Sequence, residues 1–442
     1  MMNELQYAGE YDLLECKLYT SKSTTVDLRQ EIVEIDIYED ILRGGLTGRI
    51  LVADTHSLIT SLPITGEEGL SIKIKTPGFN QNRNSLDFTG ERMFTINKIS
   101  VRAELSQGSQ IYALSFVSQE LMIANRITVS KSYTDNISTM VEDILSSEQY
   151  IGTKKELFIE PTQGVRKIVF PNSYPYAAIN KLANESYSAI TNSPHYLFYE
   201  DADGFHFRTL QDLYEQPSLG MFHYGENFKN NPTYHRGTDF EPKVETIIDL
   251  KRILKYELHN NNDMFENARS GMLTSTNIAH DIYSKKYTKE EYNYFDEFET
   301  YRRISNTSNP KYSEKVNLNR YSKGRTFVNP ISTTDGNDAN HSGSYTPNKK
   351  DEMSFSDRQS RMFEMLKGTS LTATIPGNTA MRVGKVLSLD LPVIGIDHDD
   401  ELTDKYLSGN FMVQKIRHQF SIPTKQHFIH MQLTKDCIES TV

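Results

Sequence analysis

A short phrase that occurs twice constrains this chain more than any other feature. Residues 94–99 read FTINKI and residues 411–416 read FMVQKI. In both phrases an apolar β-branched residue, Ile96 or Val413, lies two positions after a Phe and is followed by an amide, Lys and Ile. An internal repeat can decide the architecture of a whole chain, so the segments around the two phrases must be compared first.

The surrounding segments match in order. Around the first phrase lie LTGRILV (46–52), EGLSIKI (68–74) and IYALSFVS, and around the second lie LTATIPG (371–377), GKVLSLDL (384–391) and HFIHMQLT. Phe94 precedes Phe116 by 22 residues, and Phe411 precedes Leu433 by the same 22. Only the spacing between the first two segments differs, the early copy being longer by about ten residues. Alternating strands resemble one another in any β-protein, but shared order and spacing together favour a duplicated unit.

Both ends of the chain show the two-residue alternation of half-buried strands. In the segment 24–42, Val33, Ile35 and Ile37 alternate with acids, and the pair Gly44-Gly45 ends the pattern. Residues 24–118 contain at least five such strands and no convincing helix. The pattern predicts a small antiparallel barrel or sandwich at each end.

The middle of the chain changes period. Residues 132–147 carry an apolar stripe at helical spacing, with Ser132 or Thr134 as the expected N-cap. A second helix is predicted to begin at Pro175, a good first-turn residue, and the dipeptide Asp203-Gly204 predicts the turn of a β-hairpin. These features indicate an inserted α+β unit.

The region after residue 241 is mixed. Residues 244–258 weakly favour a strand, 263–271 a short helix that ends at Gly271, and 272–298 two polar strands. Residues 329–352 contain little that could be buried and are expected to be a mobile loop.

A last helix should follow that loop. Ser354 and Asp357 resemble a capping box, and Gly368 should end the helix. The predicted divisions are then four: a first β-barrel, 1–125; an α+β insertion, 126–240; a mixed β region, 241–352; and a second β-barrel, 353–442.

Composition narrows the function. Asp and Glu total 58 against 48 Lys and Arg, a formal charge of −10, which disfavours tight binding of DNA because such proteins carry a basic footprint. The two cysteines, Cys16 and Cys437, are too few for a disulfide framework. No secretory signal and no apolar run of about 20 residues is present, so we expect a soluble protein that folds in a cytoplasm without membrane insertion.

Motifs that carry chemistry are sparse. Phosphate-binding, zinc-protease and serine-hydrolase signatures are all missing. The acidic run Asp397–Glu401 is dense enough for Ca²⁺ or Mg²⁺ but lacks the spacing of a calcium loop, so a solvated turn is expected. His427 and His430 fall on opposite faces of a strand and cannot share a metal, and His418 is expected to pack or face solvent. We therefore predict no catalytic, cofactor or metal site.

Carboxylates within 1–20 or within 290–300, in the stretches EYDLLE and YNYFDEFE, leave one enzymatic alternative open. Glycoside hydrolysis needs two positioned carboxylates, one with a raised pKa, and nothing in the sequence marks such a pair. A tail-associated cell-wall hydrolase that uses these acids remains the alternative from another functional class.

Several segments, in this order, resemble the central baseplate hub of contractile-tailed phages, the T-even type, and the hub part of type VI secretion spikes. They are VDLRQEIVEIDIYEDILRGGLTGRILVAD, FPNSYPYAAINKLANESYS with YLFYEDADGFHFRTL, ARSGMLTSTNIAHDIYSKKY with YNYFDEF, and LSGNFMVQKIRHQF with HFIHMQLTKD. Together they span roughly residues 24–438.

The resemblance implies a mainly β fold with an α+β insertion and two similar tube-type antiparallel β-barrels per chain. It also implies a homotrimer that forms a pseudo-six-fold ring around a channel. Such a hub is a structural protein of the virion, assembled in the host cytoplasm. Its implied partners are the tail tube or its initiator, the central spike and the baseplate wedge proteins, and DNA passes through it without sequence-specific binding. A hub of a secretion or tailocin-like injection machine is the alternative with the same fold.

Overall fold

The computed structural model describes most of the chain between residues 5 and 436. Within that span the residues not described are 21–23, 57, 62–63, 65, 79–84, 107–108, 225–248, 261–262, 282–284, 299, 301, 305–324, 332–350, 394–402 and 405–406. The acidic run Asp397–Glu401, Cys437 and most of the loop predicted over 329–352 therefore lie outside the described residues. Residues 329–331 belong to a strand and 351–352 to a helix, so the two ends of that predicted loop are wrong.

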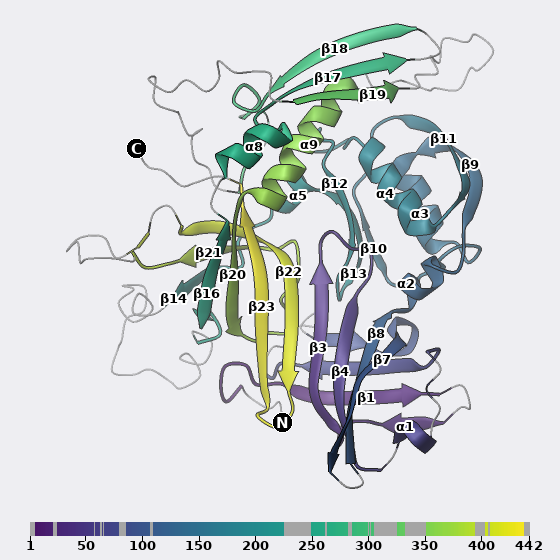
Figure 1. Ribbon diagram of the computed structural model, residues 1–442, viewed down its shortest axis with the longest axis vertical. Coiled ribbons are helices and arrows are strands. Elements are labelled where there is room, and N and C mark those ends of the chain that lie inside the picture. The colour runs from purple at the N-terminus through teal and green to yellow at the C-terminus, as the bar shows by residue number, and fades with distance from the viewer. Residues whose placement is uncertain are drawn as a thin grey trace.

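Strands predominate over helices in the described part of the chain, and the mainly β prediction is confirmed (Figure 1). Eight strands and a one-turn helix form the N-terminal part: β1 Asp12–Tyr19, β2 Thr25–Asp27, β3 Ile32–Asp40, β4 Thr47–Asp54, α1 Leu58–Ser61, β5 Gly69–Lys75, β6 Ser85–Phe88, β7 Phe94–Ser106 and β8 Ser109–Ser118. A short 3-10 turn, Gly90–Arg92, precedes β7. The pairing path β3–β4–β8–β7–β5–β1–β2 is open within the described residues.

The insertion combines helices with two small sheets. Its elements are α2 Gln119–Ala124, β9 Val129–Asn136, α3 Ile137–Ser146, β10 Glu156–Ile159, β11 Val165–Ser173, α4 Pro175–Glu185, β12 Tyr196–Glu200, β13 Gly204–Thr209 and α5 Leu210–Tyr214. The predicted start at Pro175 and the hairpin at Asp203-Gly204 are confirmed. The predicted cap of α3 is wrong: Asn136 is the N-cap, because β9 keeps residues 129–136 extended against β11.

The remaining elements build a small upper sheet and the second half of the large sheet. They are β14 Met221–Tyr224, β15 Arg252–Ile253, β16 Lys255–Asn260, α8 Met264–Ser270, β17 Thr274–Asp281, β18 Lys286–Asn293, β19 Arg325–Ile331, α9 Asp351–Lys367, β20 Thr369–Pro376, β21 Val386–Asp390, β22 Gly409–Ser421 and β23 Gln426–Lys435. Gly271 ends α8 with a left-handed φ of 83°, as predicted. The capping box is wrong, since α9 begins at Asp351 and Ser354 lies inside the helix.

Five strands at each end pair in the same order. We call β3, β4, β8, β7 and β5 the first repeat, and β16, β20, β23, β22 and β21 the second repeat; each set is hydrogen-bonded in that order, antiparallel throughout. Ile99 faces Leu114 in the first repeat, and Ile416 faces Met431 in the second. The pairs from Thr95 opposite Val117 to Ser100 opposite Ala113 recur in the second repeat with a displacement of 317 residues, so the two repeats share strand order and register along this stretch.

The opening phrase marks a β-bulge in both repeats. The register shifts between Ile96 and Lys98 against β8, and between Val413 and Lys415 against β23. An extra residue in one strand leaves it unpaired and bends the strand. The amides Asn97 and Gln414 are those extra residues, so FTINKI and FMVQKI encode the same kink, and their lysines occupy equivalent positions.

Strands β4 and β20, which contain the segments LTGRILV and LTATIPG, align differently from the prediction. Thr47 faces Val117 and Ser370 faces Thr434, so this pair of strands is displaced by 323 residues, not 325. The displacement of β5 relative to β21 is 317 residues, so the segment from β4 to β5 is six residues longer than the segment from β20 to β21, not about ten. A shift of two residues leaves the inward and outward faces of a strand unchanged, so the shared Leu-Thr pairs at 46 and 371 could not reveal the error.

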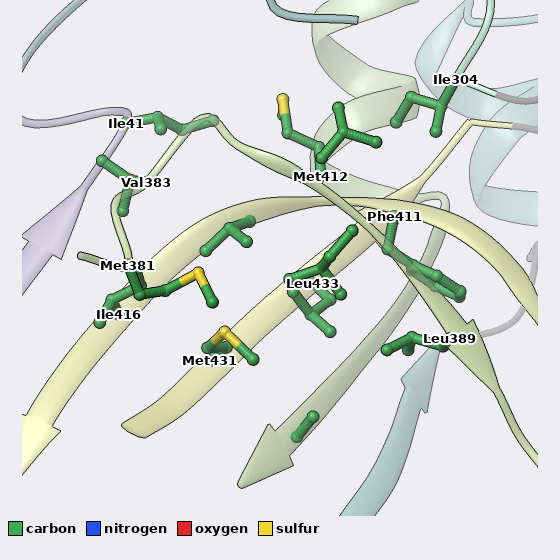
Figure 2. Close-up of a cluster of buried hydrophobic side chains, with 14 of the residues drawn as sticks. Ile41, Ile304, Met381, Val383, Leu389, Phe411, Met412, Ile416, Met431 and Leu433 are labelled. Atoms are coloured by element: carbon green, nitrogen blue, oxygen red, sulfur yellow. The ribbon is translucent and has the colours of Figure 1, made fainter. Parts of the chain in front are cut away.

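Each repeat encloses its own apolar core. Phe94 packs between Phe88 and Phe116, with ring centroids 4.4 and 4.6 Å apart. Its equivalent Phe411 lies in the second core, which Figure 2 shows with Met412, Met431 and Leu433. A third core fills the insertion around α3 and α4. No helix in the described part of the chain is both long and apolar enough to cross a bilayer.

Candidate functional site: the junction between the repeats

The two repeats meet edge to edge. β22 of the second repeat pairs antiparallel with β3 of the first, from Lys415 opposite Asp40 to Ser421 opposite Glu34 (Figure 1). Strands that end a sheet present unpaired N–H and C=O groups, and pairing satisfies them. The junction therefore makes one continuous sheet from two structural units.

Charges on the two strands complement each other. Arg417 Nε lies 2.9 Å from Asp36 Oδ1, and Arg417 Nη2 lies 3.2 Å from Glu34 Oε1. Arg49 of β4 approaches the same Asp36 carboxylate at 2.8 Å. Burial alone would lower the pKa of Arg417, but hydrogen bonding to Asp36 and its negative charge outweigh burial and raise the pKa. Asp36 is completely buried, so two guanidinium groups compensate its charge.

A hollow of about 440 Å³ lies over this junction. It is lined by Tyr38, Glu39, Asp40, Arg43, Gly45, Thr47, Thr372, Lys415, Ile416, Arg417, His430, Met431 and Gln432. The lining is charged, and it is contributed by both repeats. This makes the junction a candidate site for contact with another protein, whereas sequence reasoning had considered only His430 of these residues as a possible site residue.

The histidines lie on opposite faces of β23, as predicted. His427 is fully buried, while His430 is half-buried and bonds Thr374 and Gln419 on the other face. Sequence reasoning missed one contact: His418 Nδ1 lies 3.1 Å from His427 Nε2 across the β22–β23 hairpin. Burial lowers the pKa of His418 to about 3, and burial together with the neighbouring His418 lowers the pKa of His427 well below its ordinary value, so both rings are neutral near pH 7. The turn at 422–425, read as a hairpin, would have revealed the pair.

The two candidate stretches of carboxylates lie apart. Glu10, Asp12 and Glu15 lie on or near β1, and Asp296 and Glu297 follow β18; β1 and β18 lie at opposite ends of the molecule in Figure 1. The pKa of Glu15 is lowered, chiefly by a hydrogen bond from Ser71, whereas a general acid needs a raised one. Among the described residues, no group of three or more His, Cys, Asp or Glu side chains could hold a metal ion.

Comparison with known proteins identifies relatives of the whole chain. No family model matches the sequence. A protein of Vibrio phage KVP40 named "Probable baseplate hub protein gp334" is 22% identical over 398 residues, which cover 89% of this chain and 87% of that protein.

Two solved structures share the fold. The tail protein from Neisseria meningitidis MC58 aligns with a TM-score of 0.54 and 11% identity, over 97% of this chain and 98% of its own. The 43 kDa tail protein of prophage MuSo2 from Shewanella oneidensis aligns with a TM-score of 0.52 and 8% identity, over 96% and 98%. The sequence relative and the shared fold thus confirm, along nearly the whole chain, the resemblance to phage baseplate hub and tail proteins.

Proposed function

We propose that this chain is the central hub of a phage baseplate, and that three copies form a ring around a channel for DNA. The observation that carries the proposal is the repeated register: two units with one strand order and one bulge lie side by side in a single chain. A trimer then presents six similar units to a six-fold tail tube and a three-fold face to a spike. Closed rings of this kind are the ordinary solution for homo-oligomers.

The barrel form of each unit is part of the proposal. In the second repeat, β14 pairs with β21 and β15, and β16 pairs with β20. Only Leu254 separates β15 from β16, and its N–H donates to Thr374 O at 2.8 Å. This return of the path supports a tube-type barrel for the second repeat, and the duplication extends the argument to the first.

The proposed role is structural. The relative is named as a baseplate hub, and the two carboxylate stretches of the hydrolase alternative lie at opposite ends of the molecule. The formal charge of −10 suits a conduit that DNA must leave, because a basic lumen would hold phosphates through counterion release. The expected partners are the tail tube or its initiator, the central spike and the baseplate wedge proteins. A tailocin-like or secretion machine would use the same chain in the same way.

Light scattering tests the assembly. Purified protein, alone or with its spike, should have the mass of three chains, and a low-resolution envelope should show a ring with a central hole. A monomer that cleaves cell wall would overturn the proposal in favour of the hydrolase.

A further inference from the structure

The junction inside the chain uses one edge of each repeat and leaves the other two edges open. β3 of the first repeat pairs with β22 of the second. By the common strand order, β16 is the equivalent of β3, and β7 is the equivalent of β22. In the described part of the chain β16 pairs only with β20, and β7 beyond Ile96 pairs only with β8. These two open edges are the parts needed to form the same junction between two copies.

The register of that second junction can be transferred from the first. Inside the chain, Arg417 faces Tyr38 and Gln419 faces Asp36. The equivalent residues of β7 and β16 are found from the residues that they face on the partner strands β8 and β20, which correspond to β23 and β4. Ser100 and Ala103 stand for Arg417 and Gln419, because they face Ala113 and Ile111 of β8. Asn260 and Glu257 stand for Tyr38 and Asp36, because they face Ser370 and Thr372 of β20. The transfer places Ser100 opposite Asn260, and Ala103 opposite Glu257.

Two irregularities support this register independently. β7 has an additional bulge between Ser100 and Ala103, which β22 lacks, and Val101 there has a φ of 53°. β16 has a bulge between Leu258 and Asn260, which the β3 register lacks at the equivalent place. Either bulge alone would break the transferred pairing. Opposed, they leave two residues on each strand between the matched pairs, so the hydrogen-bond ladder can continue.

The open edges also expose apolar surface. Val101 of β7 is 66% exposed and Leu258 of β16 is 41% exposed. A strand edge with exposed apolar side chains is a ready template for pairing, and soluble proteins cover such edges or blunt them.

We infer that β7 of one copy pairs antiparallel with β16 of the next, with Ser100 opposite Asn260 and Ala103 opposite Glu257. The inference rests on the proposed trimeric hub and specifies its subunit interface. The interface is heterologous, and with a rotation of one third of a turn per copy it closes a three-membered ring in which every β3-type edge meets a β22-type edge.

Four cysteine positions test the register. In a Cys437→Ser background, the pairs Ala103→Cys with Glu257→Cys and Arg102→Cys with Leu258→Cys place thiols opposite each other, within the Cα separation that a disulfide needs. The recombined pairs Arg102→Cys with Glu257→Cys and Ala103→Cys with Leu258→Cys use the same sites but put the thiols on opposite faces of the sheet. Mild oxidation followed by non-reducing electrophoresis reads the result, and light scattering of the reduced samples gives the oligomeric state.

We expect the two matched pairs to give a ladder that stops at three linked chains, with at least tenfold less linkage in the recombined pairs. Trimers that link equally in all four variants, or in none, would overturn this edge and register while leaving the hub intact. Reduced samples that are monomeric with and without the spike would overturn the hub itself. A ladder that continues past three chains would show an open filament in place of the ring.

Discussion

Lys155 carries a positive charge that the protein encloses almost completely. Its Nζ lies 2.6 Å from Glu120 Oε2 and 2.6 Å from Glu200 Oε1, and its side chain is 2% exposed. Glu200 also accepts the backbone N–H of Leu46 at 3.1 Å, so the cluster fastens the insertion to the start of β4. Burial would lower the pKa of Lys155, but the two carboxylates outweigh it and raise the pKa.

Replacing Lys155 with Met should therefore destabilise the fold by about 3–5 kcal/mol, because two buried carboxylates lose their partner. Denaturant unfolding measures the loss. The neighbouring Lys154→Met is the matched control: its ion pair with Glu148 is exposed, and such pairs contribute about 0–1 kcal/mol. Equal effects of the two substitutions would show that the buried cluster has no special importance.

The buried histidine pair predicts acid sensitivity. Because the folded pKa of His418 and of His427 lies below the ordinary value of 6.5, the unfolded chain binds more protons as the pH falls. Above about pH 6.5 the two rings are neutral in both states and do not reduce the free energy of unfolding. As the pH falls from there toward about 3, the free energy of unfolding decreases by up to about 1.4 kcal/mol per pH unit for each ring. Burial also lowers the pKa of His195, which adds to the slope.

Unfolding free energies between pH 5 and 6.5 test this effect, since most carboxylates stay ionised there. His427→Gln should reduce the slope, although it also lowers overall stability because the ring stacks on Phe420 at 4.0 Å. His56→Gln, which replaces an exposed imidazole, is the control. A slope that is the same in wild type and His427→Gln would contradict the assignment.

At the scale of elements, the alternation of apolar residues located most strands. Pro175 marked the start of α4, and Gly271 marked the end of α8. Local pattern reports which residues face inward, because strand and helix periods are properties of consecutive residues. It could not report register: LTGRILV and LTATIPG align equally well at a shift of two, and only hydrogen-bond partners on β8 and β23 decide between the alignments.

Close approach between neighbouring strands sets a test at this scale. A Cβ on Gly48 of β4 would lie 2.1 Å from Phe116 Cζ and 2.5 Å from Asp36 O. Gly48→Ala should thus destabilise the first repeat by about 1–3 kcal/mol, since the aromatic ring must leave its place. Gly69→Ala on β5 meets nothing closer than 3.7 Å and should cost less than about 1 kcal/mol. Thermal unfolding compares the two, and a milder effect at position 48 would be contrary to this geometry.

At the scale of the whole molecule, β3 and β22 form the centre of one sheet, whereas β16 and the part of β7 beyond Ile96 form open edges among the described strands. Amides in a sheet centre exchange with solvent only on extensive opening, and edge amides exchange on local opening. In the proposed ring, β7 of one copy pairs with β16 of the next, so these two strands become central strands of a larger sheet.

Hydrogen exchange should therefore slow in residues 98–104 and 255–260 when the trimer forms, with little change in β3 and β22. β18 is the internal control, because it is an edge strand of the separate three-stranded sheet. Protection of β18 without protection of β7 and β16 would place the subunit contact on the upper sheet.

The sequence by itself determined most strands of the two repeats, the helices α3, α4 and α8 and the common order of the repeated segments, because period, turn residues and a repeated phrase are recorded in neighbouring residues. Only the tertiary structure decided that β3 and β22 join the repeats, that β14 and β16 leave the regions predicted over 126–240 and 241–352 to pair with β21 and β20, and that Lys155 and Asp36 are buried with partners. The physical reason is that hydrogen bonds between strands and buried charge pairs connect residues far apart in the chain. Their partners follow from how the apolar cores pack against one another, which no local pattern encodes.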